Sequence, residues 1–322
     1  MKRSVLLLVK ALVSVLLIGL LLARVDLGAL AQALRDYHPG FLVLSILLAP
    51  VLIWASSEKW RILVRGLGDQ VAGWRLFHFY MVGSFFNNFL PTNVGGDVVR
   101  VVQLGRATGR PLEAAVTVVV ERVTGLIALV LTAAAGLALY WGELGDRRLV
   151  SALVIVVGIL GAALMILLVP ALLRILGPLL PGALERRLAA LGERMRQSLA
   201  MFRRSPRVLA AALLWSLAFY LLAALNVYVT CLAFRQELGL LPCLAIAPLV
   251  LVVAMVPVSL GGVGMMEWAY VFTLGGFGVA APAALSVALL MRLKSLGFGL
   301  IGGLLYLASG VRQDAGQLQA KA

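Results

Sequence analysis

The chain has 322 residues, of which 62% are hydrophobic and 13% are charged, and its mean hydropathy is +1.03. These values lie far outside the range of soluble globular domains and predict an integral membrane protein. The net charge of +14 at pH 7 requires no nucleic-acid partner, because attraction to anionic lipids of the inner leaflet explains it.

Six apolar runs are near or above the length needed to cross ~30 Å of hydrocarbon as helices. They lie at residues 5–23, 41–56, 112–141, 149–169, 207–231 and 281–308. The first run has basic residues before it, as a signal peptide does, but Arg24 and Asp26 precede the small residues of a cleavage site, so we expect a retained helix. Two shorter runs, 76–90 and 243–258, each end at a break that contains proline and glycine.

The basic residues predict the orientation of these segments. If the N-terminus is cytoplasmic, most of the 28 lysines and arginines fall on the inner side, as the positive-inside rule requires. This assignment needs residues 57–75 and 91–111 both to be cytoplasmic, so the run at 76–90 must enter the membrane and turn back. Residues 243–279 must do the same from the outer side. We therefore expect a multi-pass protein of the cell (inner) membrane, with two re-entrant hairpins of opposite orientation and both termini cytoplasmic.

The two breaks have similar sequences. Pro91-Thr-Asn-Val-Gly-Gly96 matches Pro257-Val-Ser-Leu-Gly-Gly262, and with nearly the same shift Arg122 falls on Arg292. The helices before the two breaks run in opposite directions, which predicts an inverted repeat. Broken helices that are paired in this way meet near the bilayer midplane and form the binding sites of transporters.

The expected fold is therefore an all-α polytopic helical bundle that forms a single membrane domain over residues 1–322. The first repeat is expected at about 41–141 and the second at about 207–308. Between them, a stripe of large apolar residues flanked by arginines at about 181–204 predicts an amphipathic helix on the inner membrane surface.

The polar residues of the first break have two alternative roles. The helix that starts near Asp97 offers free N–H groups to an anion such as a lipid phosphate, or Asp97 satisfies those groups itself as a first-turn residue. The asparagines either bind a head group or pair the open backbone. The candidate residues of this break are Asn87, Asn88, Pro91, Asn93, Gly95, Gly96, Asp97 and Arg100. Those of the second break are Pro257, Ser259, Gly261 and Gly262.

Ionisable residues inside the apolar runs are the sharper signal, because each costs a few kcal/mol at the bilayer centre and usually faces a cavity or a partner. They are Glu121, Arg122, Arg292 and Lys294, with Glu267 at the start of the helix after the second break. If each acid pairs with one cation, one positive charge remains to attract a phosphate. The alternative is a closed structural network, or cations that extend to the membrane surface.

The two cysteines are expected at the outer face. Cys231 ends the run at 207–231 and Cys243 begins the outer hairpin. We expect free thiols that serve as small packing residues, since a disulfide would need their Cα atoms within about 7 Å. Neither a disulfide framework nor a cysteine metal site is encoded, and no metal or cofactor is expected.

Three stretches resemble a known family: FFNNFLPTNVGGDVVR at 85–100, ERVTGL at 121–126 and PVSLGGVGMMEW at 257–268. They are similar to the transmembrane region of lysylphosphatidylglycerol synthetases and to its stand-alone relatives, some of which are associated with hopanoid or polyprenol-linked lipids. The resemblance covers residues 41 to 308. It implies a lipid flippase, and because the chain ends soon after its last helix, we expect the synthetase activity of the bifunctional members to be absent.

The function expected from these observations is transport of an anionic or polyprenol-linked (glyco)lipid between membrane leaflets, without enzyme activity. Two alternatives are a membrane-embedded lipid-modifying transferase and an accessory subunit of a lipid-processing complex. The expected partners are the lipid substrate and anionic inner-leaflet lipids. A homo-oligomer and a lipid-synthesis enzyme partner are left open.

Overall fold

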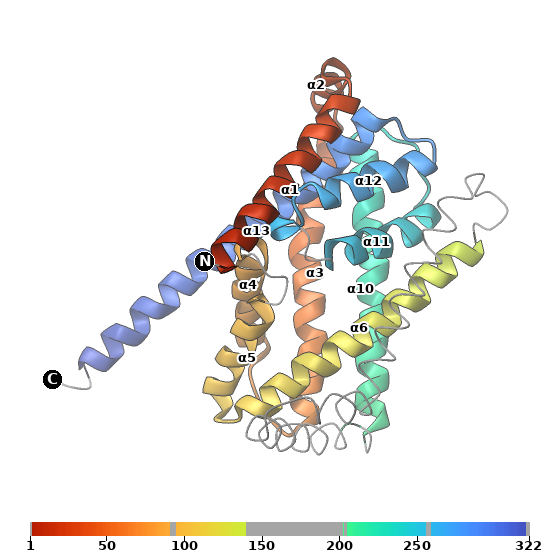
Figure 1. Ribbon diagram of the computed structural model, residues 1–322. Coiled ribbons are helices and arrows are strands. Elements are labelled where there is room, and N and C mark those ends of the chain that lie inside the picture. The colour runs from red at the N-terminus through yellow and green to blue at the C-terminus, as the bar shows by residue number, and fades with distance from the viewer. Residues whose placement is uncertain (1, 91–94, 140–201, 203–204, 256–258, 320–322) are drawn as a thin grey trace, which may run out of the picture.

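The computed structural model describes residues 2–90, 95–139, 202, 205–255 and 259–319 (Figure 1). No strand occurs in these ranges, so the expected all-α fold class is confirmed. The elements in chain order are α1 (Lys2–Arg24), α2 (Leu27–Arg35), α3 (Pro39–Gly66), α4 (Gly73–Phe89), α5 (Gly95–Thr108), α6 (Pro111–Leu139), α10 (Pro206–Ala233), α11 (Leu240–Met255), the 3-10 turn η2 (Leu260–Gly262), α12 (Met265–Gly276) and α13 (Ala281–Gln319).

Four described helices are long and apolar enough to cross a membrane, and they match four of the six predicted spans: Pro39–Gly66, Pro111–Gly136, Pro206–Ala233 and Ala281–Ser309. The run at 5–23 lies in α1, which forms with α2 a pair bent by 89° that would count as a fifth span. The bend occurs where the Asp26 carboxylate caps the first turn of α2. The run at 149–169, and the amphipathic helix expected at about 181–204 apart from Phe202, lie outside the described residues.

Helices α3 and α10 pack side by side and run in opposite directions (Figure 1). At one end of the bundle, called here the His38 end, the His38 N–H donates to the Ala233 carbonyl across 2.8 Å and joins the start of α3 to the end of α10. At the other end, called the Leu67 end, Leu63, Leu67 and Phe202 share a buried apolar cluster beside the start of α10. The opposite directions predicted for these two helices are therefore confirmed.

Helices α4 and α5 form a hairpin that leaves and returns to the Leu67 end. Arg110 follows α5, and its Nη1 donates to Asp69 Oδ1 at 3.1 Å and to the Leu67 carbonyl at 3.3 Å, both in the connection that precedes α4. The hydrogen bond to Asp69 raises the pKa of the Arg110 guanidinium, so Arg110 stays charged at physiological pH. This geometry agrees with the predicted re-entrant hairpin.

The first hairpin includes more of the chain than the sequence suggested. Residues 57–75 and 91–111 were expected to be cytoplasmic, but α3 continues to Gly66 and α5 is the return arm of the hairpin. Lys59 and Arg100 are consequently buried, with exposed fractions of 8% and 2%. Both cations contact a carboxylate of another helix, and this pairing, which the hydropathy of one segment does not reveal, makes their burial tolerable.

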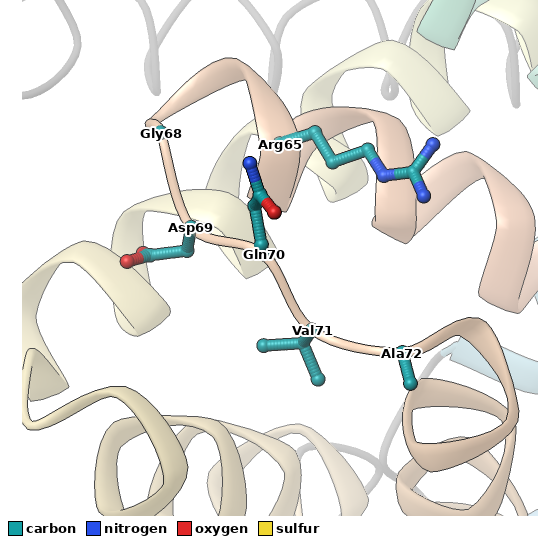
Figure 2. A pocket seen from close by; sticks show the side chains of 6 residues that line it. All are labelled: Arg65, Gly68, Asp69, Gln70, Val71 and Ala72. Atoms are coloured by element: carbon teal, nitrogen blue, oxygen red, sulfur yellow. The ribbon is translucent and has the colours of Figure 1, made fainter.

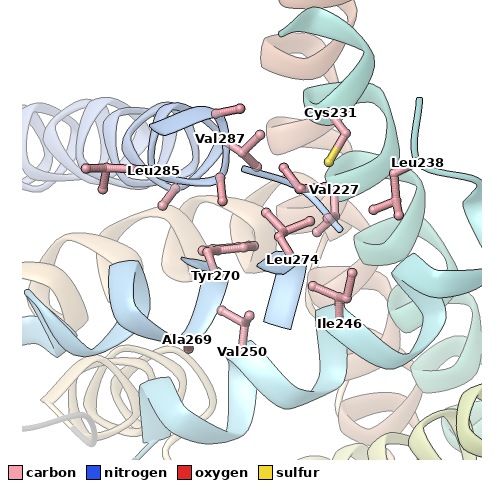
Figure 3. Close-up of a cluster of buried hydrophobic side chains, with 14 of the residues drawn as sticks. Val227, Cys231, Leu238, Ile246, Val250, Ala269, Tyr270, Leu274, Leu285 and Val287 are labelled. Atoms are coloured by element: carbon pink, nitrogen blue, oxygen red, sulfur yellow. The ribbon is translucent and has the colours of Figure 1, made fainter. Parts of the chain in front are cut away.

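The second hairpin consists of α11, η2 and α12, and it lies at the His38 end (Figure 1). Leu238 and Val279, which flank the hairpin, belong to one buried apolar cluster with Phe234 at the end of α10. Figure 3 shows side chains of this cluster gathering from several helices. Cys231 and Cys243 lie in the same cluster as free, buried thiols, as expected. The two hairpins therefore enter the bundle from opposite ends.

The helices α3, α4, α5 and α6 are repeated in order, and in the opposite direction, by α10, α11, α12 and α13. The end of α4 in the first hairpin lies against η2 in the second. At Gly261 in η2, where φ is +54°, a Cβ atom would lie only 2.7 Å from the Asn88 carbonyl oxygen near the end of α4. Both the left-handed backbone and this close approach favour glycine. The contact is the meeting of broken helices that an inverted repeat predicts.

Gly302 lets α13 pack directly on the backbone of α4, because a Cβ atom at this position would overlap the Met81 carbonyl oxygen. We expect Gly302→Ala to lower the thermal unfolding midpoint of the detergent-purified protein, since such overpacking costs about 1–3 kcal/mol. The control is Gly297→Ala, in the same helix, where the added methyl group meets no atom within 4 Å. Equal midpoints for the two variants would contradict the close packing of α4 against α13.

Candidate functional site

A group of charged side chains lies beside the first break, where α5 meets α6. Asp97 is the third residue of α5 and is buried. Its Oδ2 accepts a hydrogen bond from Arg122 Nε at 2.8 Å and lies 2.6 Å from Arg122 Nη2. Its Oδ1 lies 2.6 Å from Arg100 Nη2. Asp97 therefore pairs with two arginines, which neither of its expected roles at the helix start anticipated.

Glu121, the residue before Arg122 in α6, completes this group. Its Oε2 lies 2.8 Å from Arg100 Nη1, and its Oε1 accepts a hydrogen bond from the Tyr80 hydroxyl and lies 3.6 Å from Lys59 Nζ. Three basic and two acidic groups thus leave one positive charge in excess. We call this set the first charge cluster: Lys59, Asp97, Arg100, Glu121 and Arg122.

Arg100 is held by aromatic rings as well as by carboxylates. Its guanidinium carbon lies 4.1 Å from the centroid of the Tyr80 ring and 4.9 Å from that of Trp60. Trp60 Nε1 in turn donates to Thr117 Oγ1 at 2.9 Å. The Arg100 guanidinium thus binds two acids through Nη1 and Nη2 and lies over two aromatic faces inside the bundle. These contacts favour a role for Arg100 in positioning the acids of the cluster.

The second break carries a simpler charged pair. Arg292 Nε donates to Glu267 Oε1 at 2.8 Å, and its Nη1 and Nη2 donate to the carbonyls of Gly261 and Gly262 at 2.9 and 2.7 Å. Glu267 Oε2 also accepts from the Gly264 N–H at 2.8 Å. Arg292 is therefore the cation that pairs with Glu267. Through these two carbonyls Arg292 joins the irregular turn of the second hairpin to α13.

The two arginine–carboxylate pairs occupy equivalent places in the repeats. Both pairs span 25 residues along the chain. Asp97 and Glu267 are each the third residue of the helix after a break, and Arg122 and Arg292 lie in the long helices that follow. The comparison of the two breaks in the sequence matched the two arginines but not the two acids. The acids differ in type, Asp97 in one repeat and Glu267 in the other, and they lie outside the matching Pro–Gly motif. The equal spacing between acid and arginine was the available signal.

The two arginines differ in their exposure. The side chain of Arg292 is 9% exposed, whereas that of Arg122 is 41% exposed. The remaining cations of the first charge cluster, Lys59 and Arg100, have exposed side-chain fractions of only 10% and 3%. Arg122 is therefore the member through which the excess positive charge of the first charge cluster can reach a ligand.

The other predicted site residues have mostly internal contacts. Asn87 Oδ1 accepts from the Gly96 N–H at 2.8 Å, and Asn88 exchanges hydrogen bonds of 2.8 and 3.0 Å with Ser295 of α13. These contacts favour the backbone-pairing role of the two asparagines. The Ser259 hydroxyl is buried without a partner among the described residues. Gly95 begins α5. Outside the described residues lie Pro91, Asn93 and Pro257.

A surface hollow of about 530 Å³ lies elsewhere, at the connection between α3 and α4 (Figure 2). It is at the Leu67 end, and its lining residues belong neither to the first charge cluster nor to a break. We therefore do not assign it to the candidate site. The residues that line it are Arg65, Gly68, Asp69, Gln70, Val71 and Ala72.

Comparison with known proteins connects this geometry to a family. A family model described as the lysylphosphatidylglycerol synthase TM region matches residues 7–303. The chain is 24% identical over 290 residues to a UPF0104 membrane protein of Methanothermobacter thermautotrophicus, with 83% of this chain and 85% of the relative covered. It is 26% identical over 297 residues to a UPF0104 membrane protein of Pyrococcus horikoshii, with 83% and 86% covered.

Proposed function

Since this chain belongs to the lysylphosphatidylglycerol synthase TM region family, as its motifs predicted, we propose that it moves an anionic or polyprenol-linked lipid between the two leaflets of a membrane. Membership in the family supports a function connected with membrane lipids. The movement between leaflets and the phosphate-bearing head group are the proposal, and they rest on the geometry of the first charge cluster.

The observation that carries the proposal is the excess positive charge of this cluster together with the exposure of Arg122. Asp97 shares its two oxygens between Arg122 and Arg100, so it remains paired when Arg122 turns to another anion. A guanidinium binds phosphate through two parallel hydrogen bonds. A phosphate head group would cancel the excess charge, whose presence inside a bilayer is otherwise unfavourable.

The arrangement of the two hairpins supports movement across the membrane. They enter from opposite ends, and their breaks meet at Asn88 and Gly261. Irregular backbone is tolerated at membrane depth only where protein or a wet cavity surrounds it. We propose that a shift of one hairpin against the other opens the head-group site first to one leaflet and then to the other, as in transporters built from inverted repeats.

We further propose that the protein lies in the cell (inner) membrane with the Leu67 end in the cytoplasm, and that both termini are cytoplasmic. Arg65, Arg75, Arg106 and Arg110 lie in the elements nearest the Leu67 end, where the positive-inside rule places basic residues. Anionic inner-leaflet lipids would contact this surface. We propose that the lipid is not chemically altered, which sets the protein apart from a lipid-modifying transferase.

The proposal is tested with purified protein in vesicles that contain fluorescent phosphatidylglycerol or fluorescent phosphatidylcholine in both leaflets. A membrane-impermeant quencher reports how much label exchanges from the inner leaflet. We expect protein-dependent exchange of phosphatidylglycerol and slower exchange of the zwitterionic lipid, with the label recovered unchanged by chromatography. A new labelled product would favour a transferase, and exchange no faster than in protein-free vesicles with either lipid would contradict transport of these lipids.

A further inference from the structure

Lys294 lies in α13 and is enclosed by neutral oxygen atoms of two other helices. Its Nζ lies 2.6 Å from Ser45 Oγ in α3, and 2.8 Å from Asn226 Oδ1 and 3.0 Å from Thr230 Oγ1 in α10. The Ser45 carbonyl is a fourth acceptor at 3.4 Å. Lys294 is 6% exposed, and the three enclosing residues are buried as well. We call Ser45, Asn226 and Thr230 the oxygen cage.

Lys294 differs from the other buried cations of the described chain. Lys59, Arg100 and Arg292 each contact a carboxylate within 4.0 Å, whereas no described acidic side chain forms an ion pair with Lys294. A buried ammonium without a counter-ion is unfavourable unless hydrogen bonds compensate it. The three hydrogen bonds of the oxygen cage provide that compensation.

Few charged or titratable groups surround Lys294. On α10 the neighbouring titratable group is the Cys231 thiol, which is buried. On α3 the hydroxyl and the carbonyl of Ser45 accept hydrogen bonds from Lys294. Glu267 on α12 forms an ion pair with Arg292. The proton on Lys294 is therefore held by neutral groups rather than by a carboxylate.

The oxygen cage can satisfy both the charged and the neutral form of the lysine. Ser45 Oγ lies 2.8 Å from Thr230 Oγ1, and either hydroxyl can be the donor; Thr230 also donates to the Asn226 carbonyl at 2.6 Å. When Lys294 is an ammonium, it donates to all three cage residues and the Ser45 hydroxyl donates to Thr230. When Lys294 is an amine, the Ser45 hydroxyl can turn and donate to the nitrogen lone pair. The polar side chains of the oxygen cage therefore have a partner in either state.

From this geometry we infer that Lys294 binds and releases a proton during transport, so that lipid movement is coupled to proton movement. The inference rests on the proposed function. The step involves no bond to the lipid: a proton from water on one side adds to the Nζ lone pair, and it is later returned to water on the other side.

The position of Lys294 in α13 explains how its charge would act on the lipid path. Two residues earlier, Arg292 binds the carbonyls of Gly261 and Gly262 in the second break. The next residue, Ser295, binds Asn88 at the end of α4. A change in how firmly the oxygen cage holds Lys294 therefore acts on a short stretch of α13 that contacts both breaks.

The first test measures protonation without any lipid movement. In full-length protein reconstituted with unlabelled lipid, ¹⁵N NMR of the lysine side chains follows Nζ across the physiological pH range, and Lys294→Met identifies the signal. We expect the Lys294 signal to change between the ammonium and amine positions. A Lys294 signal that keeps one form throughout would overturn the inference.

The second test measures coupling in vesicles with a one-unit pH difference across the membrane and fluorescent phosphatidylglycerol as the probe. If one proton moves with each lipid, the leaflet ratio at steady state should shift about tenfold from its value without a gradient. Lys294→Met and Ser45→Ala should lose this shift. Ser216→Ala is the matched control, because this buried α10 hydroxyl bonds only within its own helix, to the Ala212 carbonyl at 2.8 Å.

The outcomes separate the two proposals. Exchange of the label in wild-type vesicles with no change in leaflet ratio under the gradient would overturn proton coupling and leave lipid transport standing. A shift that persists in Lys294→Met would show that the proton uses another group. If the wild-type protein moves no label at all, transport and coupling fail together, and the NMR measurement alone decides whether Lys294 is a proton-binding site.

Discussion

Substitution of Arg292 by glutamine is expected to remove most of the folded protein. Arg292 neutralises Glu267 at 2.8 Å and donates to the carbonyls of Gly261 and Gly262. Glutamine would leave the buried carboxylate without a cation. It would also remove the guanidinium N–H groups that donate to the carbonyls of the turn. Removing one partner of a buried ion pair costs about 3–5 kcal/mol, a large part of the stability of a typical domain. The measurement is the yield of monodisperse protein after detergent extraction, together with its unfolding midpoint.

The control for this prediction removes both charges at once. In the double variant Arg292→Gln, Glu267→Gln, no carboxylate remains unpaired, so part of the yield should return. Both variants lose the donors to the glycine carbonyls, and the difference between them isolates the cost of the unpaired acid. If the single variant folds as well as the wild type, Arg292 does not hold the second break in the way that its contacts indicate.

A helix could be predicted from the sequence where its own residues identify it, by an apolar stretch of sufficient length or by proline and glycine at its end. The helices α3, α6, α10 and α13 are apolar over lengths that fit a membrane, and proline and glycine mark both breaks. The α5 segment could not be assigned in this way. It contains Asp97, Arg100 and Arg106, and its burial depends on carboxylates and arginines that come from other helices.

The sequence predicted the type of candidate site, a group of buried charges, but not which residues form it. One unbalanced positive charge was expected from the sequence, but the prediction grouped Arg122, Arg292 and Lys294 with two acids. The structure divides these residues among three places and brings Lys59 into the first charge cluster. A lysine that follows an apolar run is normally assigned to the aqueous side. The structure instead buries Lys59 and pairs it with Glu121.

Arg122→Gln is expected to slow lipid movement strongly while the protein stays folded, in contrast to the same substitution at Arg292. Asp97 keeps its contact with Arg100 at 2.6 Å, so no acid is left unpaired. Without Arg122 the first charge cluster has two basic and two acidic groups and carries no excess charge. Loss of a charge-assisted contact to phosphate, worth about 1.5–3 kcal/mol, predicts exchange of fluorescent phosphatidylglycerol that is about 10- to 100-fold slower.

Two further variants show whether Arg122 acts through its charge or through its shape. Arg122→Lys keeps the excess charge but cannot form the two parallel hydrogen bonds of a guanidinium, so we expect exchange between that of the wild type and that of Arg122→Gln. Arg75→Gln removes an exposed arginine of α4 outside the cluster and should exchange lipid as the wild type does. If Arg122→Gln loses yield in proportion to exchange, Arg122 is a structural partner of Asp97. If it keeps both yield and exchange, the head group binds elsewhere and the proposed site is wrong.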